Sequence, residues 1–144
     1  VAKATGDNKY KDIAIKHAMT TMNNHFRPDY TCWHVVSYNN DGTVESKQTF
    51  QGKDDDSSWA RGQAWAIYGY TACFRETNDS IFLNFAKDIA DMIMDRVKTE
   101  DAIPYWDYDA PVTKETPRDV SAASVTASAM IELSTMVPDG QKRF

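Results

Sequence analysis

The sequence predicts an all-α fold in which helix pairs repeat and one small β-hairpin is inserted. Four segments carry apolar residues with the 3.6-residue period of a helix, and one stretch between them changes to β-type runs. The first and third helical segments align at an offset of 72 residues, and the second and fourth align at an offset of 63. Repeated helix pairs of this kind stack into an open superhelix or close into a ring.

The first half of the chain is predicted to hold a helix, a hairpin and the start of a second helix. Residues 8–26 carry the helical period, which ends at Arg27-Pro28 because proline disfavours a helical conformation in the residue before it. Residues 30–50 hold two β-type runs, and the Asn-Asn-Asp-Gly sequence between them is a strong hairpin signal. The second helix is expected over about 57–76, after a group of turn and capping residues.

The second half is predicted to hold two helices joined by a long loop. Asn78-Asp79 forms a turn and an N-cap, and an amphipathic helix follows from about 80 to 97. A proline-containing loop spans 99–117, and Asp119 caps a last helix that runs through about 136. The small residues on the second and fourth helices are those expected of inner members of a ring. Because long loops in a compact domain are usually functional, we expect a cleft at the end of the ring where they lie.

Composition limits the kinds of protein that this chain can be. With 144 residues, 42% of them apolar, it is long enough for one core, so residues 1–144 are expected to form a single domain. The net charge is -5 and the 16 basic residues are scattered, so we expect no nucleic-acid-binding face. No apolar run is long enough to span a membrane.

The cysteines and the ends of the chain give further expectations. Cys32 and Cys73 read as two buried thiols, and no Cys and His spacing suits a zinc site, so we predict no metal and no cofactor. The chain begins with neither Met nor the features of a signal peptide, which is typical of the interior of a longer protein. Both a cytoplasmic and an exported location stay open.

The stretch 51–70, QGKDDDSSWARGQAWAIYGY, carries the candidate binding site. Trp59, Arg61 and Trp65 fall within the first two turns of the expected helix. Indole faces stack on sugar rings, and a guanidinium group matches a carboxylate in bidentate geometry. The start of a helix also favours an anion through its N–H groups and its dipole. The alternative is that both indoles are core anchors and that Arg61 only extends along the surface.

Several acidic residues resemble the carboxylate pairs of glycosidases, but capping explains most of them better. Residues 54–56 are three aspartates at the expected start of a helix, where carboxylates bind the N–H groups and stabilise the dipole. Asp107 and Asp109 flank Trp106 in the long loop and could line the cleft, although the sequence indicates no specific partner for either. We assign no catalytic residue.

Four segments, HVVSYN, QGKDDDSSWARGQAWAIYGY, IPYWDYDAP and RDVSAASVTASAMIEL, resemble the unsaturated glucuronyl hydrolases of glycoside hydrolase family 88. The resemblance covers nearly the whole chain and implies an incomplete segment of an (α/α)6 barrel with a small hairpin insertion. It also implies the substrate, a small oligosaccharide whose non-reducing end is a 4,5-unsaturated uronic acid left by a polysaccharide lyase. Such enzymes hydrate the double bond without a metal, and the hemiketal then rearranges to release the sugar.

By the same resemblance, five residues match substrate-site positions: His34, Gln51, Trp59, Arg61 and Trp65. The two indoles would wall the sugar ring and Arg61 would bind the uronate carboxylate. Gln51 or His34 would hydrogen-bond sugar hydroxyls or the attacking water. The family's two essential aspartates precede a turn that stands here at residues 3–7, so we expect the catalytic acid upstream and no turnover by these 144 residues alone.

Other functions stay open from the sequence. The related unsaturated rhamnogalacturonyl hydrolases tend to show RGNGW where this chain has RGQAW, and they are the alternative within the enzymes. A helical-repeat scaffold and a carbohydrate-binding domain without catalysis are the alternatives outside them. A partial ring also exposes the flanks of its end helices, so we expect self-association unless other segments cover them.

Overall fold

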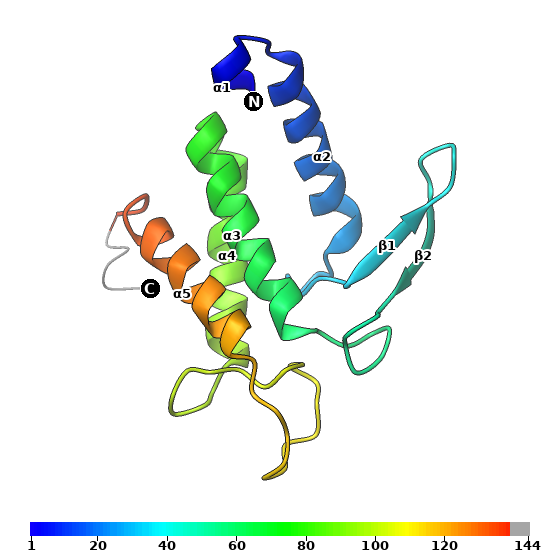
Figure 1. Ribbon diagram of the computed structural model, residues 1–144, viewed down its shortest axis with the longest axis vertical. Coiled ribbons are helices and arrows are strands. Elements are labelled where there is room, and N and C mark those ends of the chain that lie inside the picture. Colours follow the sequence, from blue (N-terminus) through cyan, green and yellow to red (C-terminus); the bar gives the residue numbers. More distant parts are fainter. Residues whose placement is uncertain (139–144) are drawn as a thin grey trace.

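The computed structural model describes residues 1–138, which form helices and one antiparallel hairpin (Figure 1). The elements in chain order are α1 (Ala2–Thr5), α2 (Lys9–His25), β1 (Val35–Tyr38), β2 (Val44–Gln48), α3 (Ala60–Thr77), α4 (Ser80–Arg96) and α5 (Val120–Ser134). The fold class predicted from the periodicity is confirmed. The hairpin also forms as predicted, with Val35 paired to Gln48 and Ser37 paired to Ser46.

Two predicted helix caps are confirmed. At the start of α4, Asp79 Oδ1 accepts a hydrogen bond of 3.0 Å from the backbone N–H of Ile81. At the start of α5, Asp119 Oδ1 accepts one of 2.8 Å from the N–H of Ala122. Each carboxylate therefore binds one of the N–H groups that have no partner within the helix.

The predicted start of α3 and the capping role of residues 54–56 are wrong. Helix α3 begins at Ala60, and its N-cap residue Trp59 makes no side-chain cap. The backbone of Trp59 is not helical and bridges to Asp107 of the long loop, and the Tyr108 N–H donates to Ser58 O at 3.0 Å. Residues 54–56 instead form a tight turn, in which the N–H of Asp56 donates to Asp54 Oδ1.

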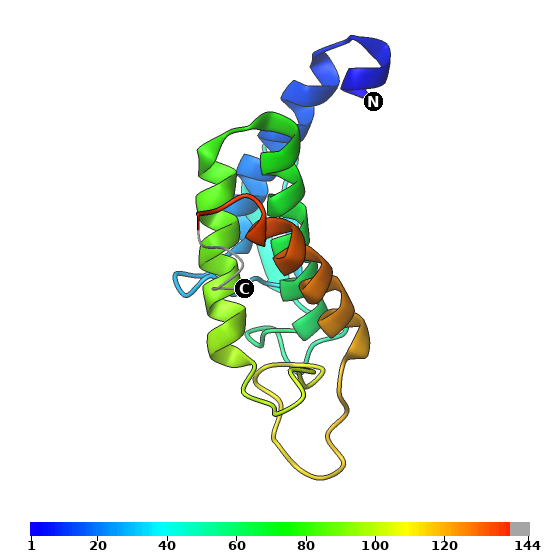
Figure 2. The ribbon, with the colours of Figure 1, turned by 90° about the vertical axis from the view of Figure 1, so that its left-hand side faces the viewer.

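Most of the core lies between α3, α4 and α5, and Figure 2 shows α4 running alongside the other two. Ile67, Phe82, Ile89 and Leu133 are completely buried there. Between α3 and α5 a second cluster consists of alanines, including Ala64 and Ala122, which let the two backbones approach closely. The two helices are therefore close neighbours, as their small residues predict, and their place on the inside of a ring stays a prediction.

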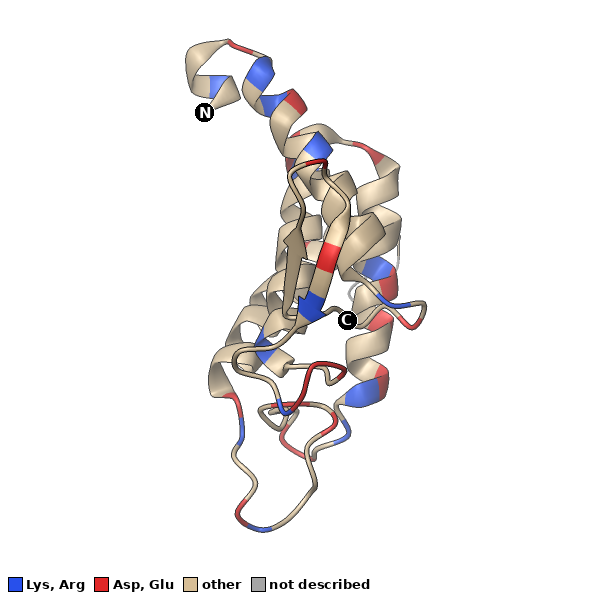
Figure 3. Ribbon diagram, turned by 90° about the vertical axis from the view of Figure 1, so that its right-hand side faces the viewer, with Lys and Arg blue, Asp and Glu red and all other residues tan. Residues whose placement is uncertain are grey.

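Helix α2 and the hairpin lie to one side of this core (Figure 1). Helix α2 has one buried residue, Ala18, whose carbonyl accepts a hydrogen bond of 2.9 Å from the Tyr70 hydroxyl of α3. Lys and Arg are interspersed with Asp and Glu over the elements visible in Figure 3. Cys32 is buried, which raises the pKa of its thiol to about 12, and Cys73 is a partly buried free thiol. Within residues 1–138, no helix is both long and apolar enough to cross a membrane.

Candidate functional site

A mainly apolar cleft of about 400 Å³ lies between α2, α3 and the segment that leads into β1. Helix α3 contributes Trp65 and its N-cap residue contributes the Trp59 ring, and the segment before β1 contributes Trp33 and His34. Three indoles and three imidazoles, the latter from His17, His25 and His34, thus open onto one cleft, and aromatic linings are common in sites that bind small molecules.

Contacts with both helices hold the segment that carries His34. The backbone N–H of Trp33 donates to His25 O, at the end of α2, at 2.9 Å. The completely buried amide of Gln63 in α3 binds both backbone groups of Cys32, accepting from its N–H at 2.8 Å and donating to its carbonyl at 3.1 Å. Gln63, which lies in the stretch 51–70, therefore holds the backbone of the segment that forms this wall of the cleft.

The ring of His34 is held in one tautomer. The backbone N–H groups of Phe50 and Gln51 point at its Nδ1 from 3.2 and 3.3 Å, and Thr49 Oγ1 lies 3.1 Å away. Because a backbone N–H can only donate, Nδ1 accepts and the ring proton is on Nε2. Burial lowers the pKa of His34 below its ordinary 6.5, so the ring is a neutral hydrogen-bond donor.

The indoles differ in how they are held. The Trp59 ring lies 4.3 Å from the His34 ring, at an interplanar angle of 32°. Trp65 is 53% exposed and meets Tyr68 edge to face. That exposure argues against the core-anchor alternative for Trp65.

Sequence reasoning did not identify Trp33 as part of the cleft. Its ring is covered by two cations, with Arg27 Cζ at 4.3 Å and Lys47 Nζ at 3.5 Å from the ring centre. The only signal in the sequence was its position next to His34.

Arg61 and Gln51 do not line this cleft. The Arg61 guanidinium lies 5.2 Å from the Trp59 ring and forms an ion pair with Asp119 Oδ2, through Nε at 3.1 Å and Nη2 at 3.0 Å. Gln51 has an exposed side chain and reaches the site only through its backbone N–H. The structure thus brings His34, Trp59 and Trp65 together on one cleft, while of these three Arg61 contacts only the Trp59 ring and Gln51 only His34.

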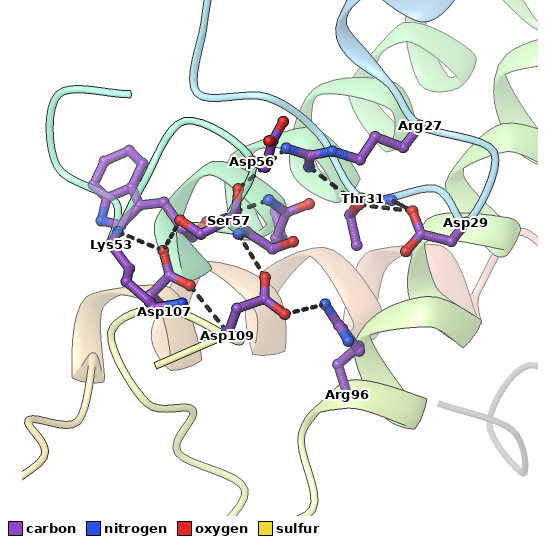
Figure 4. A network of polar contacts seen from close by, with 12 residues as sticks. Arg27, Asp29, Thr31, Lys53, Asp56, Ser57, Arg96, Asp107 and Asp109 are labelled. Carbon is purple, nitrogen blue, oxygen red and sulfur yellow. Dashed lines mark hydrogen bonds and ion pairs between the residues drawn. The ribbon is translucent and has the colours of Figure 1, made fainter. Parts of the chain in front are cut away.

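Asp107 and Asp109 have the partners that the sequence did not indicate, and they lie outside the cleft lining (Figure 4). Asp107 accepts from the Ser57 hydroxyl at 2.6 Å and from the Lys53 N–H at 2.9 Å. Asp109 accepts from the Ser58 N–H and forms an ion pair of 2.9 Å with Arg96. Both carboxylates join the long loop to residues 53–58. Within residues 1–138, no group of three or more His, Cys, Asp and Glu side chains is arranged to hold a metal ion.

Helix pairs around closely packed inner helices, with a hairpin and an aromatic cleft, define a segment of an α/α barrel. No family model matches the sequence. The chain is 47% identical over 135 residues to an unsaturated glucuronyl hydrolase of Formosa agariphila, which covers 92% of this chain and 34% of that protein. It is 32% identical over 139 residues to an unsaturated chondroitin disaccharide hydrolase of Streptococcus pyogenes, covering 96% of this chain and 35% of that one.

Solved structures agree with these relatives. An unsaturated glucuronyl hydrolase specific for heparin matches 99% of this chain with a TM-score of 0.95 at 47% identity, over 39% of its own length. The unsaturated glucuronyl hydrolase of Bacillus sp. GL1 matches 98% with a TM-score of 0.92 at 32% identity, over 38% of its length. The chain spans about a third of the length of the curated relatives. It matches a segment of the unsaturated glucuronyl hydrolases, as the motifs predicted.

Proposed function

We propose that this chain binds the unsaturated uronyl end of a small oligosaccharide, as the sugar-binding part of an unsaturated glucuronyl hydrolase. The observation that carries the proposal is that Trp59, Trp65 and His34 open onto one cleft of about 400 Å³. Among the matched structures, one carries dGlcA-Glc-Rha-Glc and another, from Streptococcus agalactiae, is complexed with dGlcA-GalNAc6S. Both support a sugar with an unsaturated end as the ligand here.

The residues divide the binding between stacking and hydrogen bonds. The exposed Trp65 indole offers its face to the sugar ring, while His34 donates through Nε2–H to a hydroxyl. A neutral imidazole suits this role, because it keeps the donor without placing a charge in an apolar cleft. Gln51 is exposed and its N–H lies next to His34, so its side chain is the proposed second partner of the sugar hydroxyls.

Arg61 is proposed to bind the uronate carboxylate from beside Trp59. Its two bonds to Asp119 use Nε and Nη2, so Nη1 is not needed for them. Because Asp119 balances the charge, Arg61 acts more as an oriented hydrogen-bond donor than as a free cation. Arg61→Lys keeps the charge but loses the planar fork, and it should weaken binding of the uronate sugar more than binding of a neutral sugar.

The proposal is tested by titrating the 144-residue chain with an unsaturated heparin disaccharide and an unsaturated chondroitin disaccharide, using calorimetry. Trp65→Ala should weaken binding on the order of tenfold, because a stacking contact is worth about 1 kcal/mol or more. Circular dichroism should stay unchanged, since the side chain is half exposed. Tyr10→Ala, which removes an exposed aromatic ring outside this cleft, is the control. Equal affinity of Trp65→Ala and the unsubstituted chain would contradict the proposal, and no sugar binding at all would favour a protein-binding scaffold.

A further inference from the structure

The carboxylate of Asp107 is completely buried and holds three hydrogen bonds. Its Oδ2 accepts from the Ser57 hydroxyl at 2.6 Å and from the Lys53 N–H at 2.9 Å (Figure 4). Its Oδ1 accepts from the N–H of Asp109 at 2.9 Å. Burying a carboxylate costs free energy unless its oxygens accept hydrogen bonds. The three donors therefore stabilise the buried charge of Asp107, and Asp107 in turn holds the donors in place.

The turn at 49–53 packs tightly against this carboxylate. A Cβ atom placed on Gly52 would lie 3.1 Å from Asp107 Oδ2 and only 2.6 Å from Thr49 Oγ1. The Gly52 N–H also donates to Thr49 Oγ1 at 2.8 Å. Glycine is therefore the residue that fits there, and the turn has little room to shift relative to Asp107.

The opposite side of the same turn contacts the cleft. The N–H groups of Phe50 and Gln51 and the hydroxyl of Thr49 surround Nδ1 of His34. Asp107 binds the same turn through the backbone N–H of Lys53, which lies two residues after Gln51. One short segment thus links a buried carboxylate, which is outside the cleft, to the tautomer of an imidazole within it.

We propose that Asp107 is a positioning residue, which holds the turn at 49–53 so that its donors keep the proton of His34 on Nε2 for the ligand. The tautomer of His34 is a property of the chain without sugar. The consequence for affinity rests on the function proposed above, in which Nε2–H donates to a sugar hydroxyl.

The test compares Asp107→Asn with Asp101→Asn. Asp101 is exposed on the same loop and also accepts from a backbone N–H, that of Ile103, but it does not touch residues 49–58. Imidazole ¹⁵N resonances of His34 should report one tautomer in the unsubstituted chain and in Asp101→Asn. In Asp107→Asn they should report a mixture of the two tautomers. Affinity for the unsaturated disaccharides should fall on the order of tenfold, or about 1.4 kcal/mol.

A milder variant keeps the test decisive if Asp107→Asn does not fold. Ser57→Ala removes the shortest of the three bonds and leaves the carboxylate in place. Its His34 resonances should shift in the same direction by a smaller amount. An unchanged tautomer in every folded variant overturns the proposal. A tautomer change with unchanged sugar affinity supports the link from Asp107 to His34 and contradicts the role given to His34 in the proposed function.

Discussion

Gln63 is the residue whose substitution tests the construction of the cleft most directly. Its buried amide binds the N–H and the carbonyl of Cys32 at 2.8 and 3.1 Å. Gln63→Met keeps the length of the side chain but leaves both backbone groups without a partner in a buried place. Each unpaired group costs about 1–3 kcal/mol, and the buried thioether offsets part of the sum, so the free energy of unfolding should fall by about 2–4 kcal/mol. Urea denaturation measures this change.

Gln51→Met is the matched control, because it makes the same replacement at an exposed side chain. Its free energy of unfolding should stay within about 0.5 kcal/mol of the unsubstituted chain, as is usual for surface changes. The Nε2 contact of Gln63 with Trp59 O adds little to the cost, since that carbonyl also accepts the Gly62 and Gln63 N–H groups. A loss below about 1 kcal/mol in Gln63→Met would falsify the view that this amide holds the His34 segment in place.

Three further predictions concern backbone fit, pH and turnover. Gly52→Ala should lower the free energy of unfolding by about 1–3 kcal/mol, because the added Cβ would contact Thr49 and Asp107 too closely. Gly69→Ala should raise it by up to about 1 kcal/mol, because the added Cβ meets nothing within 4 Å and alanine is favoured over glycine in a helix. Urea denaturation of both variants checks this pair. The pKa values of His25 and His34 are lowered by burial. The unfolded chain therefore takes up these protons first, and stability should decline as the pH falls below about 6.5, which urea midpoints across that range would show. The 144-residue chain should bind the unsaturated disaccharide without consuming its double bond, because the described residues that line the cleft include no carboxylate and His34 is a neutral donor; a steady loss of ultraviolet absorbance would contradict this.

The sequence predicts the helices and the hairpin well because their signals are local. Periodicity, turn residues and caps such as Asp79 and Asp119 act over a few residues, and the structure confirms them. The start of α3 was misplaced because a contact between distant segments decides it. Trp59 bridges to Asp107, 48 residues further along the chain, and this keeps Ser57 and Ser58 out of the helix.

For the candidate site as well, the sequence predicts local features but not contacts between distant segments. The spacing of Trp59 and Trp65 on one helix is visible in the sequence, and the structure places both on one cleft. The sequence predicts Arg61 as a ligand contact and Asp119 as a helix cap. It does not reveal that these two residues, 58 positions apart, form an ion pair. It also could not reveal that Gln63 binds backbone atoms, since a glutamine in a Trp-rich motif fits a ligand contact equally well.

The polar residues near the cleft differ from the aromatic ones in what they contribute. Gln63 and Asp107 are completely buried, and they form hydrogen bonds with backbone groups and one serine hydroxyl of the chain itself. Trp65 is half exposed, and packing within α3 does not require an indole at that position. The exposed half of this ring adds nothing to the stability of the fold, whereas a sugar ring would cover it. We therefore expect substitutions of Gln63 and Asp107 to lower the free energy of unfolding and to disturb the position or the tautomer of His34. Substitution of Trp65 should instead weaken sugar binding with little effect on stability.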